Sequence, residues 1–93
     1  MFLAEVVFYA GQRKLLPQIG YRPDAVFDGS DDYWGITFAD LKAERFDTPI
    51  LSAIEFTFQA AHYREIAEGQ TFKIMEGSRQ VGEGRVISVE KER

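Results

Sequence analysis

The stretch Phe72–Val89, FKIMEGSRQVGEGRVISV, has the pattern of a β-hairpin. Two runs in which apolar and polar residues alternate lie on either side of Gly77 and Ser78, and this alternation is typical of half-buried strands. Glycine readily adopts the positive φ of tight hairpin turns, so the turn is predicted at these two residues. Gly82 and Gly84 lie inside the second run, where glycine weakens a strand. They predict a β-bulge or a close approach of another backbone.

Four further runs at strand spacing precede the hairpin. They span Phe2–Tyr9, Tyr21–Phe27, Tyr33–Ala39 and Ile50–Ala60. Pro23 has no N–H to donate, so its part of the second run is expected at a sheet edge or a bulge. Both faces of the first run are largely apolar. Its second face (Leu3, Val7 and Tyr9) is therefore expected to be covered by the chain itself or by a partner.

The segments between the runs are rich in turn-forming and charged residues. Gly11–Gly20 predicts a loop and Asp28–Asp32 a turn. Asp40–Thr48 is compatible with one helical turn capped by its first aspartate, and His62–Gly69 with a turn of helix ended by its last glycine. Six strands joined by short connections are typical of all-β domains, and closing them into a barrel leaves no exposed sheet edge. We therefore predict one domain over residues 1–93, an all-β, small six-stranded antiparallel closed β-barrel with a frayed, charged C-terminal tail.

The composition excludes several classes of site. The chain has 93 residues, 45% of them hydrophobic, which suffices for one packed core. It has no cysteine, and therefore no disulfide, thiolate zinc site or cysteine nucleophile; this composition fits a reducing cytoplasm. The opening MFLAEVVFYAG has no basic segment and is interrupted by Glu5, so neither a signal peptide nor a membrane span is expected. The net charge of −4 lacks the basic excess of a typical nucleic-acid binder.

Several segments resemble the C-terminal (third) domain of bacterial elongation factor Tu. Gly20–Pro23 reads GYRP and is followed by Phe27, as in that family. Glu76–Val86, EGSRQVGEGRV, is similar to the family's EGGRTVGAGVV hairpin, and Phe2–Val6 is similar to its FxAEV start. Arg13 corresponds to the arginine of the family's GGRH segment. The matches occur in the family's order and span nearly the whole chain. The resemblance implies a six-stranded antiparallel barrel, in agreement with the strand pattern.

The resemblance also implies a place for RNA or a protein partner. In the family, the third domain helps to hold the backbone of aminoacyl-tRNA, contacts the nucleotide-exchange partner and packs against the GTPase domain. By resemblance, an RNA backbone or a partner would lie by the loop at Arg13 and Lys14 and by the turn at Ser78 and Arg79. Arginine and lysine give phosphates charge-assisted hydrogen bonds. The alternative is that these residues are solvated loop charges.

Departures from the family change the expected function. The sequence contains no GxxxxGK[ST] phosphate loop, so binding and hydrolysis of GTP are not expected. The turn at Asp28–Gly35 is longer and more acidic than the family's RTTDVTG, and the GGRH segment is reduced to GQRK at Gly11–Lys14. Glu83 stands between two hairpin glycines and places negative charge where a phosphate would lie. A free-standing relative with a different ligand is therefore expected.

Arg22 and three neighbouring aspartates each have two interpretations. Arg22 binds a phosphate or a partner carboxylate, or it pairs structurally with Asp24 or Glu76, and pairing is favoured. The aspartates crowd one turn without the spacing of a calcium loop, and Asx-type turns are favoured. They are Asp28, Asp31 and Asp32.

His62 and a set of aromatic residues are further candidates. One histidine without cysteine makes no metal site, so His62 is expected to be a surface loop residue, and no metal or other cofactor is predicted. The aromatic set fits a stacking platform for bases, but strand spacing favours the core. The set is Trp34, Phe38, Phe56 and Phe58.

The first hypothesis for function is a non-catalytic binding module that acts by protein–protein contact or self-association. The second is a translation-related protein that binds tRNA or another RNA backbone. The candidate RNA- or partner-binding residues are Arg13, Lys14, Arg22, Ser78 and Arg79. A third hypothesis, a small enzyme with an unrecognised carboxylate site, has no supporting motif, and no catalytic residue is assigned.

Overall fold

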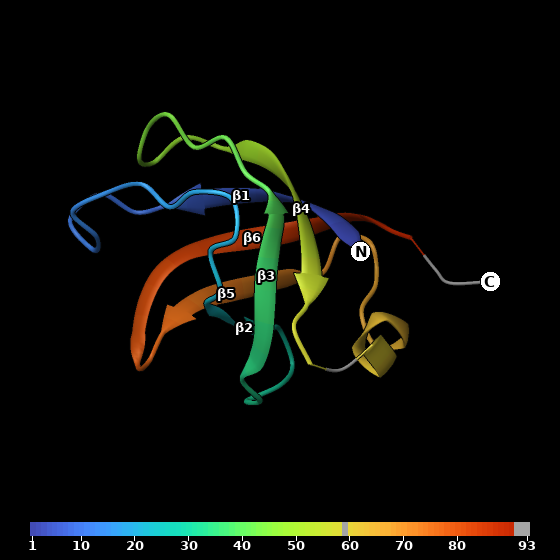
Figure 1. Cartoon of the computed structure of the whole chain (residues 1–93). Helices are drawn as coiled ribbons and strands as arrows, with labels where there is room; N and C mark the ends of the chain where they lie inside the picture. Colours follow the sequence, from blue (N-terminus) through green and yellow to red (C-terminus); the bar gives the residue numbers. More distant parts are fainter. Residues whose placement is uncertain (59, 91–93) are drawn as a thin grey trace.

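The computed structural model describes residues 1–58 and 60–90, which form an all-β, six-stranded antiparallel closed barrel (Figure 1). The strands are β1 (Phe2–Phe8), β2 (Asp24–Phe27), β3 (Trp34–Asp40), β4 (Ile50–Phe56), β5 (Thr71–Glu76) and β6 (Arg79–Val89). Their order around the barrel is β1-β4-β3-β2-β5-β6, and β6 pairs with β1 to close it. The predicted fold class is therefore confirmed. No helix in the described part of the chain is long and apolar enough to cross a membrane.

The barrel interior is filled by the alternate residues of every strand. In β1, Phe2, Ala4, Val6 and Phe8 are buried while the residues between them face outward. The ring of Phe2 packs against several other aromatic rings at centroid distances of 5.3–6.5 Å. These rings belong to Phe27, Phe56, Tyr63 and Phe72. Apolar burial and edge-to-face aromatic packing stabilise this core.

The two glycines of β6 lie where neighbouring atoms come closest. A Cβ added at Gly82 would overlap the carbonyl oxygen of Val7 in β1, and one at Gly84 would overlap the buried ring of Phe72 in β5. The register of β6 also shifts by one residue against both neighbours, so the long strand carries bulges and bends around the barrel. The predicted close approach of another backbone is confirmed at Gly82, whereas the neighbour of Gly84 is a side chain. The bulges lie at Val81 and Ile87 rather than at the two glycines.

The second strand is shorter than predicted and begins at Asp24. The residues before it still follow β3: Gly20 donates to the Phe38 carbonyl, Phe38 donates to the Tyr21 carbonyl and Ile36 donates to the Pro23 carbonyl. Pro23 cannot donate in return, so the regular ladder begins at the next residue.

The fourth strand ends at Phe56, four residues before its predicted end at Ala60; Gln59 lies outside the described residues. The prediction that Phe58 belongs to the core is wrong, because its side chain is 78% exposed. Its ring lies over the backbone of Gly35, where a side chain would be crowded. Phe38 and Phe56 are buried, and Trp34 packs at the edge of the core.

The two segments with predicted helical turns behave differently. Residues 40–49 contain no helix; the left-handed backbone of Asp47 (φ 58°) turns them, and Asp47 donates to the Phe8 carbonyl. A 3-10 helix, η1 (Ala60–Arg64), confirms the second turn, although it ends before Gly69. His62 is less exposed than a surface loop residue, since its ring stacks on Trp34 with 3.7 Å between centroids.

Candidate functional site

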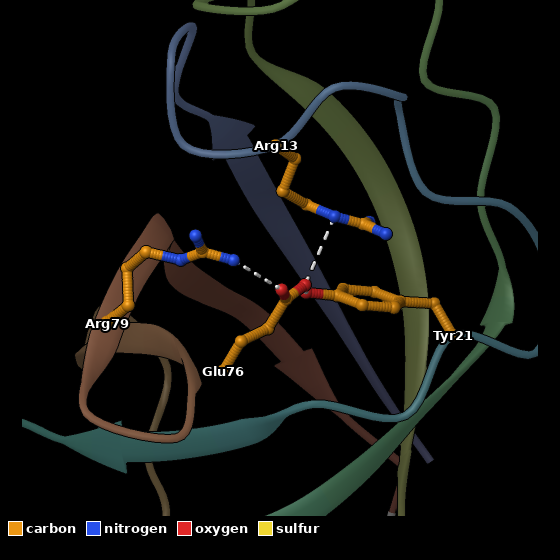
Figure 2. Close-up of polar contacts among 4 residues, drawn as sticks. All are labelled: Arg13, Tyr21, Glu76 and Arg79. Atoms are coloured by element: carbon orange, nitrogen blue, oxygen red, sulfur yellow. Dashed lines mark hydrogen bonds and ion pairs between the residues drawn. The ribbon is translucent and has the colours of Figure 1, made fainter.

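Two of the predicted site residues converge on a carboxylate at the end of β5 (Figure 2). Glu76 Oε2 lies 3.1 Å from Arg13 Nε, and Glu76 Oε1 lies 3.3 Å from Arg79 Nη2. The Tyr21 hydroxyl donates to Oε2 at 2.5 Å. The hairpin places Arg79 directly opposite Glu76, while Arg13 and Tyr21 come from the two ends of the long loop after β1. We call these four residues the Glu76 cluster.

The Glu76 cluster is a partly buried clamp. The Arg13 guanidinium carbon lies 4.7 Å from the centre of the Tyr21 ring, which adds a cation–π contact to the ion pair. About a quarter of the Arg13 and Glu76 side-chain surface is exposed, so solvent screens this pair less than an open surface pair. The cluster thereby ties the loop after β1 to the β5–β6 hairpin.

Burial and the Glu76 carboxylate shift the pKa of Tyr21. Desolvation of its phenol is the larger cause, and the hydrogen bond to Glu76 follows; together they raise the pKa well above the usual 10.0. Tyr21 is therefore a neutral donor to Glu76 over the physiological pH range. This keeps the carboxylate hydrogen-bonded from one side while the arginines balance its charge from the other.

The remaining predicted residues do not join the cluster. Lys14, Arg22 and Ser78 are exposed. The favoured pairing of Arg22 with Asp24 or Glu76 is wrong, because no ion pair of Arg22 forms among residues 1–58 and 60–90. Glu76 instead has Arg13, Tyr21 and Arg79 as partners, and Asp24 is the first residue of β2. The structure thus brings two of the five candidates together, on a carboxylate of this chain.

A second feature is an apolar surface on the outside of β4, β1 and β6. Leu3 is 36% exposed, Leu51 62% and Ile87 39%. These strands are neighbours, and Leu3 lies opposite Ala53 on one side and Ser88 on the other. We call Leu3, Leu51 and Ile87 the apolar face. Alternation would have revealed Leu51 and Ile87, because both are apolar residues in the outward phase of their strands.

The rest of the predicted second face of β1 is covered by the chain. Val7 and Tyr9 are half-buried, and Tyr9 donates a 2.7 Å hydrogen bond to Glu83 while it accepts one from Gln80. Burial and Glu83 raise the pKa of Tyr9 to about 12. Of this predicted face, Leu3 alone among the three residues remains exposed.

A polar cleft of about 490 Å³ lies between the turn after β2 and the outer sides of β5 and β6. Lys73 and Glu83 line it along the sheet, with Asp28 and Asp31 on the turn. Ser30 rather than an aspartate makes the side-chain bond in this turn, by accepting from the N–H of Asp32. No group of three or more His, Asp or Glu residues suited to a metal occurs in the described part of the chain.

Comparison with known proteins finds no family model that matches this chain and no curated protein that is similar to it in sequence. The fold and surface therefore define its class: a small closed antiparallel β-barrel with a clamped loop at one end and an exposed apolar sheet face.

Proposed function

We propose that this chain is a non-catalytic binding module of the cytoplasm that acts by protein–protein contact through its apolar face. The observation that carries the proposal is the exposure of Leu3, Leu51 and Ile87 on three adjacent strands. Apolar side chains that are exposed together on a surface can mark a site of protein–protein contact. An outward sheet face of this kind suits a protein surface more than a small ligand.

We further propose that the barrel is a free-standing relative of the third domain of elongation factor Tu. The six-stranded antiparallel barrel and the order of the three similar segments support this relationship. Third domains in that family pack against neighbouring protein, so a separate copy of the barrel has a comparable surface to cover.

The charge distribution favours protein over RNA as the partner. Arg13 and Arg79, two of the cations that RNA would need, already face Glu76 at 3.1 and 3.3 Å. A phosphate would have to compete with that carboxylate, and the net charge of −4 opposes a polyanion at long range.

An affinity experiment with a single outward substitution tests the proposal. The tagged barrel is immobilised, exposed to cell extract, and compared with Leu51→Asp and with the control Leu15→Asp. Leu15 is 77% exposed but lies in the loop after β1, away from the apolar face. We expect a protein that is retained by the original chain and by Leu15→Asp, and at least about tenfold less by Leu51→Asp, because a buried charge without a partner is costly.

Two results would overturn the proposal. One is the absence of any protein, a second copy of this chain included, whose binding depends on Leu51. The other is tight binding of tRNA at low salt that is lost in Arg13→Ala and Arg79→Ala, which would assign the surface to RNA instead.

A further inference from the structure

We infer that the partner of the apolar face is a second copy of this chain, related by a two-fold axis that runs between β1 and β6, parallel to these strands. This inference rests on the proposed function, since it uses the same surface. It adds the identity of the partner and the geometry of the contact.

Opposite charges on the two strands carry the inference. Glu5 of β1 lies directly opposite Arg85 of β6 in the register of the sheet, and both side chains are about half exposed, with 4.0 Å between their charged atoms. A two-fold axis between the strands exchanges their positions across the contact. Glu5 of each copy then faces Arg85 of the other, which forms two equivalent intermolecular ion pairs.

Apolar side chains flank these charges in the same symmetric way. Leu3 lies opposite Ser88, and Ile87 is the extra residue where the register of β6 shifts against β1. The same axis brings Leu3 of one copy over Ser88 and the adjoining Ile87 of the other, and it does so twice. Leu51 lies opposite Glu5 on the far side of β1 and shields the ion pairs from water. A self-complementary surface of this kind is what a two-fold contact requires.

The contact is small, because the surfaces of two barrels curve away from each other. A weak dimer is therefore expected, with a dissociation constant on the order of 100 µM, typical of contacts at the low end of interface size. Sedimentation velocity from about 10 µM to about 1 mM covers the transition. The original chain should change from monomer to dimer over this range.

Charge exchange tests the geometry without altering the core. Glu5→Arg and Arg85→Glu each place like charges across the axis twice, so each variant should remain monomeric at about 1 mM. The intramolecular pair is exposed, so either substitution should cost at most about 1 kcal/mol of stability, and circular dichroism verifies the fold. Glu44→Arg, an exposed change of the same size in the loop after β3, should dimerise like the original chain.

Mixing the two monomeric variants is the decisive measurement. The Glu5→Arg variant carries arginine at both positions of the pair, and the Arg85→Glu variant carries glutamate at both. Each contact across the axis in an equimolar mixture then joins opposite charges, so the mixture should form a heterodimer. The double exchange in one chain should also restore the homodimer.

The inference is overturned if the original chain stays monomeric at about 1 mM, if the single variants dimerise normally, or if the mixture stays monomeric. A monomeric chain that still retains another protein through Leu51 would overturn the second copy as partner and leave the proposed function standing. If the chain stays monomeric and also retains no other protein through Leu51, both the dimer and the proposed function are overturned.

Discussion

Glu76 is the residue on which distant parts of this chain meet. Its carboxylate accepts from Tyr21 and faces Arg13 and Arg79, so it satisfies charge and hydrogen-bonding groups from the loop after β1 and from the hairpin turn (Figure 2). Arg13 Nη1 is buried and has no hydrogen-bond partner among the described residues. The guanidinium is thus held by its Nε contact and by the Tyr21 ring, and it depends strongly on Glu76.

The substitution Glu76→Gln tests this dependence. It keeps an acceptor for Tyr21 but leaves two neighbouring arginines without a counter-charge, so the free energy of unfolding should fall by about 1–3 kcal/mol. Urea denaturation measures the change. Glu65→Gln, which removes the exposed partner of His62, should change it by less than about 0.5 kcal/mol. Equal effects of the two substitutions would contradict the special role of Glu76.

Strand β6 decides how the barrel closes. It is eleven residues long and pairs with both β1 and β5. It has glycine at the two positions where atoms of those strands come closest to it. Glycine in a strand carries a cost in conformational entropy. Gly82 and Gly84 nevertheless occur in β6, because any side chain at these positions would collide with a neighbouring strand.

Alanine at these glycines should be destabilising, and unequally so. Gly82→Ala meets a backbone carbonyl that cannot rotate away, so the free energy of unfolding should fall by about 3 kcal/mol. Gly84→Ala meets the Phe72 ring, and the smaller side chain in Gly84→Ala/Phe72→Leu should recover part of the loss relative to the sum of the single changes. Ser88→Ala on the same strand should be nearly neutral. Chemical denaturation of these variants and of Phe72→Leu checks this order, and additive effects at the second site would refute the proposed collision.

The sequence predicts the strands well, but it predicts their ends and the contacts between distant segments poorly, for a physical reason. Alternation in β1 and β6 reports which side of a strand is apolar, and the glycines of β6 report a close approach, so the barrel and the contact at Gly82 could be predicted. The positions of the bulges, at Val81 and Ile87, could not. The ends of β2 and β4 depend on whether a backbone donor finds a partner. The Glu76 cluster depends on barrel closure, which brings together residues far apart in sequence.

Two tyrosines of the molecule link segments that are distant in sequence, and the pKa of each phenol is raised above 10.0. Tyr21 joins the loop to Glu76, and Tyr9 joins β1 to Glu83, with pKa values raised in both cases by burial and a carboxylate. Because these pKa values lie above 10.0, the unfolded chain loses its phenolic protons first as the pH rises. The alkaline limit of stability is therefore set partly by these two links.

The titration of these tyrosines should accordingly leave stability unchanged below about pH 9 and should lower it as the pH rises from about 10 toward 12. Urea denaturation at a series of pH values measures the fall, and ultraviolet absorbance of tyrosinate follows the titration directly. Tyr21→Phe should be less stable near neutral pH and should show a shallower alkaline fall. An unchanged slope in this variant would show that Tyr21 titrates normally.

The position of β1 in the barrel has a consequence for the order of folding. β1 is hydrogen-bonded to β4 on one side and to β6 on the other (Figure 1). During synthesis, β1 therefore waits for residues 82–89 before its second edge is paired. Pairings between such distant segments form slowly, and an open apolar strand edge invites aggregation in the meantime. Synthesis thus leaves one edge of β1 exposed until β6 has been made, and a chain interrupted before β6 becomes a natural client for chaperones.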